Sequence, residues 1–253
     1  MATMSADPLG ITVMLEELRR RDADMRSVPE EMAKPMRQIG ALLDKAATLM
    51  AMAREAGLPT TRPMPKAVER LVMNLQTHDI FSQRLAHIYP VFSIIWKTVD
   101  CDGRPARPIG PPNPKVLPLL CQATSLASSL LCATRMELDR SILQIRDALR
   151  ELAAVLEGQG GAPINIESPM IALDLLETRI RSAEFVLDQL HQALRVVVPS
   201  EVDQDFFIEL PEGQFDDLLR NYSMSAEHQI HRAELGSSVP PEKAADPGDV
   251  VLF

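Results

Sequence analysis

Apolar residues recur at alternating spacings of four and three along four long stretches of this 253-residue chain. Such a spacing places them in one stripe along an α-helix, and each helix must bury that stripe against a neighbour. The first stripe lies between Arg37 and Arg54 and consists of Ile39, Leu43, Ala46, Met50 and Ala53. No other feature limits the possible folds as strongly, because several helices of this kind have to share one core.

Three further stripes have the same spacing. The second, from Pro65 to about Val99, consists of Leu71, Leu75, His78, Ser82, Leu85, Tyr89, Phe92 and Trp96. The third, from about Leu117, consists of Leu138, Ile142, Ile145, Leu149, Leu152 and Leu156. The fourth, with Ser168 as its expected cap and Pro169 in its first turn, consists of Leu173, Leu176, Ile180, Ala183, Leu187, Leu190 and Leu194. Together they predict an all-α protein, an elongated antiparallel four-helix bundle made of two helical hairpins.

Composition favours the same fold class. Aromatic residues make up only 4% of the chain and apolar residues 46%, a balance that favours helices over a sheet and suffices for a core. The net charge of −9 argues against non-specific binding to nucleic acid or to anionic membranes as the main activity. Because we find neither a continuous apolar run of about 18 residues nor a secretory signal, we expect no membrane insertion and a cytoplasmic location.

Breaks in the helical pattern divide the chain. We expect an N-terminal segment at 1–36 and a helical bundle at 37–199, whose two hairpins are joined by a connector at 101–118. Six prolines make this connector unsuitable for a helix or a central strand. A short segment and an additional C-terminal helix, expected from about residue 211, occupy 200–235. The polar, Pro-rich stretch 236–253 is expected to be a flexible tail.

The second stretch contains an acid and an amide one helical turn apart, Asp79 and Gln83. Residues four apart are neighbours on one helical face, so both side chains can approach a single external group. In a chain of this length, an Asp followed four residues later by a Gln is expected roughly 0.5 times by chance. Asp188 and Gln192 form a second example in this chain. That second pair belongs to a charged flank, whereas Asp79 is the only charge on a flank of amides and small residues. Asp79 and Gln83 are therefore our candidate site, with a helix kink expected beyond them at Pro90.

Two segments and the C-terminus resemble parts of one group of proteins. The run LQTHDIFSQRLAHI, residues 75 to 88, resembles the active-site helix of CheZ-type chemotaxis phosphatases and the LQxxDxxxQxxxH segment of related helical, chemotaxis-associated proteins. The run NYSMSAEHQIH, residues 221 to 231, is similar to a Tyr-Ser/Thr-Met-x-x-Glu segment toward the ends of such proteins. The terminal DVVLF is similar in character to their short acidic and apolar tails. The prolines and the two unequal hairpins depart from a simple CheZ hairpin.

The resemblance implies an enzyme, a phosphatase that removes the aspartyl phosphate of a CheY-like response regulator. In that family the acid pairs with the active-site lysine of the regulator, while the amide orients a water in line with the phosphate. Asp79 would take the first role and Gln83 the second. Phosphoryl transfer depends mainly on positioning and charge stabilisation, and an amide can hold a water without competing as a nucleophile. The regulator would supply Mg²⁺, so no cofactor of the chain's own is implied.

Further residues are candidates for partner binding. Gln76 lies on the same flank as Asp79, and His87 follows Gln83 by one helical turn, so both are expected to contact the partner. The apolar tip of the tail has no obvious role in folding, and we interpret it as a docking peptide, although it would also fit packing onto its own bundle. This tip consists of Asp249, Val250, Val251, Leu252 and Phe253.

Other interpretations remain open at this point. The acid and the amide also fit a hydrogen-bonded surface pair of purely structural value. The whole chain also fits a non-enzymatic adaptor or scaffold in bacterial signalling, or a structural coiled-coil protein. The heptad stripes would also permit a homodimer through a shared bundle.

The sequence gives little support for a metal site or for disulfide bonds. His78 falls on the second stripe, where an interior histidine is expected more often than a metal ligand. His228 and His231 are three residues apart beside Glu227, but alone they supply too few ligands. The three cysteines follow no CxxC spacing, so we expect free thiols at Cys101, Cys121 and Cys132.

Overall fold

The computed structural model describes residues 8–55, 63–99, 109, 112–158, 166–198, 215–219, 222 and 225–235. These residues form helices and contain no strand, which confirms the all-α prediction. The long helices are α1 (Pro8–Arg26), α2 (Val28–Glu55), α3 (Pro63–Thr98), α4 (Leu117–Gly158) and α5 (Glu167–Val197). A 3-10 turn, η1 (Pro114–Val116), precedes α4, and two short helices follow α5, namely α6 (Asp216–Leu219) and α7 (Ser225–Leu235).

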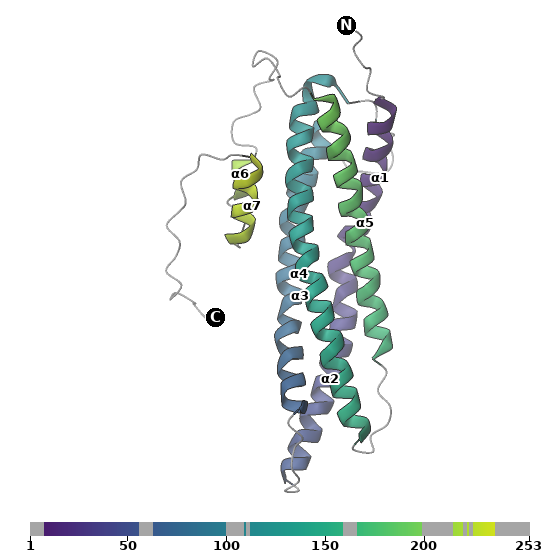
Figure 1. The fold of residues 1–253 in the computed structure, drawn as a ribbon, viewed down its shortest axis with the longest axis vertical. Helices are drawn as coiled ribbons and strands as arrows, with labels where there is room; N and C mark the ends of the chain where they lie inside the picture. Colours follow the sequence, from purple (N-terminus) through teal and green to yellow (C-terminus); the bar gives the residue numbers. More distant parts are fainter. Residues whose placement is uncertain are drawn as a thin grey trace.

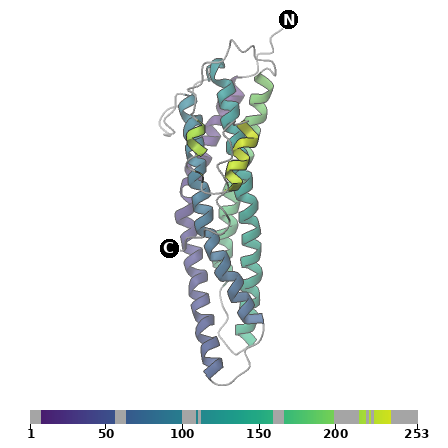
Figure 2. The same cartoon turned by 90° about the vertical axis from the view of Figure 1, so that its left-hand side faces the viewer.

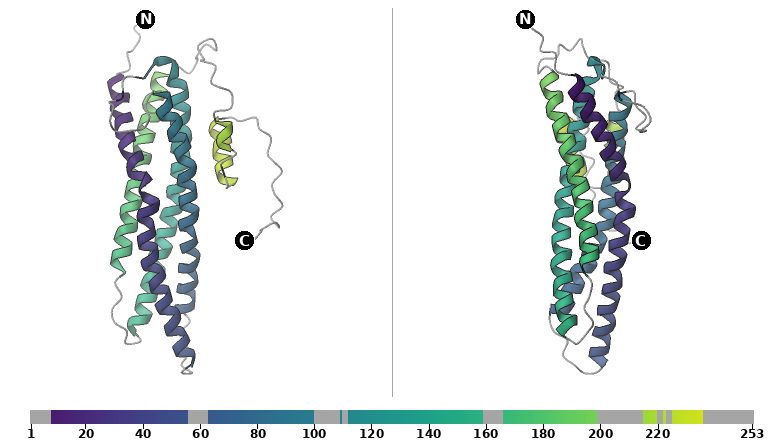
Figure 3. Two further views of the ribbon diagram at one scale, coloured as in Figure 1. Left: turned by 180° about the vertical axis from the view of Figure 1, so that it is seen from behind. Right: turned by 90° about the vertical axis from the view of Figure 1, so that its right-hand side faces the viewer.

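The long helices run side by side and give the molecule an elongated shape (Figure 1). α1 and α2 follow one another along one side of it, and α2 packs against both α3 and α5. α4 also packs against α3 and α5, while α1 packs against α5 (Figure 3). Because α3 and α5 share their neighbours and make little contact with each other, they lie on opposite sides of the core.

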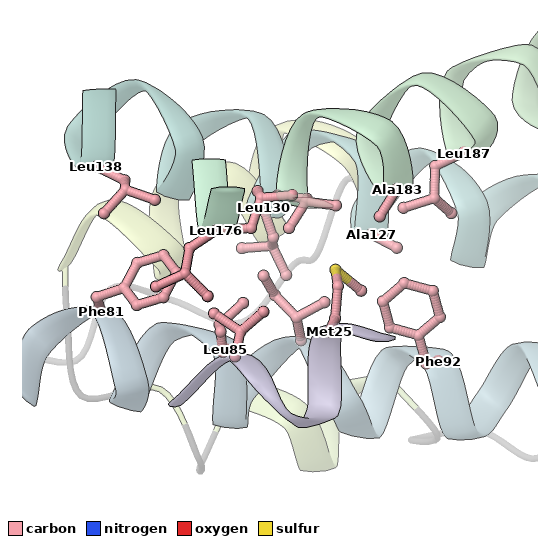
Figure 4. Close-up of a cluster of buried hydrophobic side chains, with 14 of the residues drawn as sticks. Met25, Phe81, Leu85, Phe92, Ala127, Leu130, Leu138, Leu176, Ala183 and Leu187 are labelled. Carbon is pink, nitrogen blue, oxygen red and sulfur yellow. The ribbon is translucent and has the colours of Figure 1, made fainter. Parts of the chain in front are cut away.

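The core is built from the predicted stripes. Every predicted core residue of α5 is buried, as are the members of the α4 stripe from Leu138 to Leu152. Side chains from α1, α3, α4 and α5 meet in the cluster of Figure 4, where Met25, Phe92 and Leu187 point toward one another. Four predicted stripe members lie outside the side chains that the structure describes: Ala53, Leu75, His78 and Leu156.

The helical core begins before residue 37, where we expected it to start. α1 contributes Leu15, Leu18 and Met25, each fully buried, and buried core residues occur from Ile11 onward. The N-terminal boundary of the predicted bundle is therefore too late. The pattern of α1 is hard to read because its buried face also carries the charged residues Arg19 and Asp22.

Pro29 accounts for the break between α1 and α2 and for one bond between α1 and α3. A proline has no N–H, so the carbonyl of Met25, four residues earlier, loses its helical donor. The Tyr89 hydroxyl donates to that carbonyl at 3.0 Å, and burial raises the pKa of Tyr89 to about 12. The indole N–H of Trp96 donates to the buried Asp22 carboxylate at 2.9 Å. These two bonds hold α1 against the second half of α3.

The ends of α5 and the course of α3 differ in part from the predictions. α5 begins at Glu167 after Ile166, with no side-chain cap bond, so the assignment of Ser168 as the cap was wrong. An acidic residue in the first turn favours the helix N-terminus electrostatically, and Glu167 occupies that position. α3 continues as one helix through Pro90, and the kink there stays a prediction.

The C-terminal part also departs from the predicted single helix. It consists of the short α6 and the longer α7, with Tyr222 between them outside any helix. The expected tail at 236–253 and most of the Pro-rich connector lie outside the described residues. Within the connector, Ile109 is buried, and its backbone N–H donates to Glu16 of α1 at 2.6 Å.

One stretch of α4, Leu117–Val155, is long and apolar enough to cross a membrane by length and composition alone. About 50% of its most apolar window is buried inside the protein, as in the core helix of a soluble bundle. The fold is thus compatible with a soluble helical protein, and the cytoplasmic location stays a prediction.

Candidate functional site

Asp79 and Gln83 both lie on α3 with exposed side chains. Elsewhere around the same helix, Leu71, Phe81 and Leu85 are buried in the core. The apolar face thus orients the helix so that the acid and the amide face away from the core. Exposure is a requirement for contacting an external group, and both side chains meet it.

The second acid and amide pair, on α5, shows what a structural pair looks like. Gln192 donates from Nε2 to a carboxylate oxygen of Asp188 at 2.8 Å, on an exposed surface. A hydrogen bond between neighbours one turn apart stabilises a helix only slightly. The structural interpretation therefore describes Asp188 and Gln192 well.

Two ion pairs fix the register between α3 and α4. Arg84 contacts Glu137 at 2.6 Å, and Arg70 contacts Glu151. The step from Arg70 to Arg84 along α3 equals the step from Glu151 back to Glu137 along α4, so the two helices are antiparallel. This register brings the stretch of α4 between Glu137 and Glu151 alongside the turns that carry the acid and the amide.

Exposed apolar side chains occur on the helix that carries the candidate site and on its neighbour α4. Val72, Met73 and Ile80 lie on α3, and Met136 and Leu143 lie on α4; we call these five residues the apolar border. The exposed fraction is 64% for Met73 and 55% for both α4 residues. A group of exposed apolar residues beside polar ones is typical of a surface that docks another protein.

The C-terminal helix α7 packs next to His87, one helical turn beyond Gln83. α7 packs on α4 and α6 packs on α3, as Figure 2 shows. His87, one turn beyond Gln83, has its Nδ1 atom 2.8 and 3.0 Å from the two carboxylate oxygens of Glu227. Farther along α7, Glu234 accepts a hydrogen bond from Ser129 of α4 at 2.6 Å. These contacts hold α7 directly beyond the acid and amide turn.

Tyr222 brings three histidines together at this junction. Its ring makes edge contacts with His87, His228 and His231, at centroid distances of 5.9, 5.7 and 5.5 Å. Its hydroxyl lies 3.2 Å from Nδ1 of His231. Burial is the main cause that raises the pKa of Tyr222, and the negative charge of Glu227 raises it further. The two segments that resemble chemotaxis proteins, residues 75 to 88 and 221 to 231, therefore meet in space.

The other predicted site residues have different outcomes. His87 contacts α7, with only 15% of its side chain exposed, and its role in partner binding stays a prediction. The Gln76 side chain and the tip at 249–253 lie outside the described residues, as does Cys101. Cys121 and Cys132 are free thiols, and burial raises the pKa of each. Among the described side chains, no group of three or more His, Cys, Asp or Glu is placed to hold a metal ion.

Several residues around the site were missed in the sequence. Met136 and Leu143 are apolar, seven residues apart and off the core stripe of α4, a signal that was available. Their relation to Asp79 depends on the α3 and α4 register, which the sequence pattern does not give. Glu227 is 140 residues from His87, and no local pattern connects the two.

Comparison of the chain with protein-family models, with curated proteins and with solved structures gave no match.

Replacing Glu227 by Ala is expected to loosen α7 from the bundle. The change removes the buried carboxylate that His87 contacts, at a cost of about 2 kcal/mol, or roughly 30-fold in the opening equilibrium of α7. Amide hydrogen exchange should therefore speed up across residues 225–235 and stay unchanged in α5. Gln229→Ala, at an exposed position of the same helix, serves as the control. Equal rates of amide hydrogen exchange in the two variants would contradict the role of the His87 and Glu227 contact, here called the clasp, in holding α7 on the bundle.

Proposed function

We propose that this protein binds a phosphorylated CheY-like response regulator and promotes the loss of its phosphoryl group. The observation that carries the proposal is the exposed pair Asp79 and Gln83, one turn apart on a rigid, well-packed helix. Asp79 would pair with the active-site lysine of the regulator. Gln83 would orient the attacking water in line with the aspartyl phosphate.

The chemistry asks little of this chain beyond positioning. In phosphoryl transfer the charge on the phosphate oxygens is neutralised by cations, and the nucleophile has to be held in line. In the proposal, Mg²⁺ and the lysine come from the regulator, so this chain adds only an oriented water and a contact that fixes the two proteins. Holding the water already in place lowers the entropic part of the barrier.

The apolar border supports the docking step. An acid and an amide alone give few contacts, whereas a stable protein complex buries apolar side chains at its centre. Ile80 is the residue after Asp79 on α3, and Met136 and Leu143 are exposed on the neighbouring helix α4. They would pack against the regulator and bring its phosphorylated site onto Gln83.

The remaining parts of the proposal concern architecture and attachment. We interpret the five long helices as one antiparallel four-helix bundle. In this bundle α1 and α2, placed end to end, together occupy the position of one helix. Residues 249–253 would form a second attachment point for the same regulator, in the cytoplasm. A tether of about 17 residues spans roughly 20 to 25 Å, so it would keep the regulator at a high local concentration.

The test is the lifetime of the phosphoryl group on a set of CheY-like receiver domains, measured with and without the full chain in the presence of Mg²⁺. At least one receiver should lose its phosphate faster when the chain is added, in proportion to the complex formed. Binding with an unchanged lifetime would instead identify a non-enzymatic adaptor. If no receiver binds the chain and none loses its phosphate faster, the proposal as a whole is overturned.

A further inference from the structure

α5 carries a second heptad stripe, on the face turned away from the core. This outer stripe consists of Ile171, Leu175, Thr178, Ser182, Phe185, Gln189, Gln192 and Val196. Its four large apolar members are exposed by 67%, 51%, 61% and 81%, in chain order. Large apolar side chains scattered singly are ordinary on a protein surface, but a row at alternating spacings of four and three is the pattern of a helix that packs on another helix.

We propose that the outer stripe is the contact surface for a second copy of this chain, with the two α5 helices packed antiparallel about a two-fold axis. The axis would pass between Ser182 and Phe185. Each Ser182 then faces Phe185 of the second copy, so that a small side chain leaves room for a large one. At the two ends of the contact, Ile171 faces Val196 of the second copy.

Charges beside the outer stripe fit the same register. Asp174, Arg181, Asp188 and Arg195 follow each other at intervals of seven residues along one flank and alternate in sign. In the antiparallel pair, Arg181 faces Asp188 of the second copy, and Asp174 faces Arg195. Two-fold symmetry repeats each pairing, so the whole flank is complementary to itself.

A parallel pair of α5 helices would not use these charges equally well. In a parallel coiled coil this flank faces the opposite flank of the partner helix. That opposite flank is mostly uncharged, since it consists of Ala172, Arg179, Val186 and Ala193. The alternation of charge therefore favours the antiparallel arrangement.

The contacts that these charges make within one chain leave them available. Asp188 bonds to Gln192 on the surface, and Arg181, with 59% of its side chain exposed, pairs with Glu177 and Asp139. Asp174, with 52% of its side chain exposed, pairs with Arg146 of α4. Exposed pairs of this kind contribute little and are readily exchanged. Polar members of the stripe, such as Thr178 opposite Gln189, would fix the register of the pair.

The proposed dimer also leaves the candidate site open. α5 and α3 lie on opposite sides of the core, and α5 faces the viewer beside α1 in the right-hand view of Figure 3. Joining two copies through α5 therefore keeps Asp79 and Gln83 of each copy on the outside of the dimer. The self-association does not depend on the proposed phosphatase activity.

The test is sedimentation of the full chain over a wide range of protein concentration. The unaltered protein should show a monomer and dimer equilibrium, and Phe185→Glu should weaken the dimer about 100-fold. Leu143→Glu, a matched change of an exposed apolar residue on α4, should leave the equilibrium unchanged. A protein that stays monomeric at every concentration, or an equal loss with Leu143→Glu, would overturn the proposal.

A charge exchange tests the antiparallel register itself. Asp188→Arg places like charges opposite each other at two symmetric positions and should weaken the dimer roughly tenfold. Adding Arg181→Asp to that variant restores opposite charges and should recover most of the loss. Both positions are exposed, and circular dichroism would confirm that each variant keeps its helices. A double variant no better than the single one would rule out this register.

Discussion

Gln83→Ala is expected to slow the loss of phosphate from a bound regulator by about 100-fold, because a misplaced nucleophile alone has an effect of that size. The amide would act only by orienting the attacking water, so its removal should leave the affinity for the regulator nearly unchanged. Single-turnover measurements with the chain in saturating excess separate the two quantities. The exposed position of Gln83 means that circular dichroism and thermal unfolding should not change.

The control is the same substitution at Gln122, which is exposed on α4 away from the acid and the amide. It should keep the full rate. Asp79→Ala offers a contrast, since losing the contact to the regulator lysine should weaken binding together with the rate. If the unaltered chain accelerates dephosphorylation and Gln83→Ala accelerates it equally, another group must orient the water. If the unaltered chain has no effect, the proposed function fails before any variant is made.

The helices could be predicted from the sequence where their buried face is purely apolar. All predicted core residues of α5 are buried, and their stripe consists only of leucine, isoleucine and alanine, whose burial removes apolar surface from water. α1 was missed because Asp22 lies on its buried face. The Oδ2 atom of the Asp22 carboxylate accepts hydrogen bonds from the Trp96 indole, 74 residues away, and from Arg26 one turn along the helix. A buried charge is tolerated only with such partners, and the distant one leaves no mark in the local pattern.

The candidate site was predictable in the same uneven way. The exposure of Asp79 and Gln83 follows from their position off the stripe of α3, which the sequence displays. The level of Met136 and Leu143 along the bundle relative to Asp79 depends on the antiparallel register of α3 and α4, which the long-range ion pair of Arg84 with Glu137 reveals. The clasp of His87 and Glu227 joins segments 140 residues apart in the chain. Helical periodicity describes one helix at a time, so it cannot supply such pairs.

Phe92→Ala is expected to lower the free energy of unfolding by about 3 to 5 kcal/mol, the usual cost of removing a fully buried aromatic ring. The Phe92 side chain, labelled in Figure 4, is completely buried. Its ring stacks on Trp96 with a centroid distance of 6.3 Å. The packing around it involves several helices, so the cavity should not collapse easily. Urea unfolding followed by circular dichroism gives the free energy directly.

Phe185→Ala makes the same chemical change on the exposed face of α5, where 61% of the residue is accessible. In a monomer this change should cost far less than Phe92→Ala. Because association with a second copy stabilises the folded state by mass action, the unaltered protein should become harder to unfold as its concentration rises. Phe185→Ala should remove most of that dependence, whereas Phe92→Ala should keep it and lower the stability at every concentration. A loss with Phe185→Ala as large as with Phe92→Ala in dilute solution would contradict the assignment of Phe185 to the surface. The two variants thus separate the stability of the single chain, which depends on Phe92, from the proposed association of two chains, which depends on Phe185.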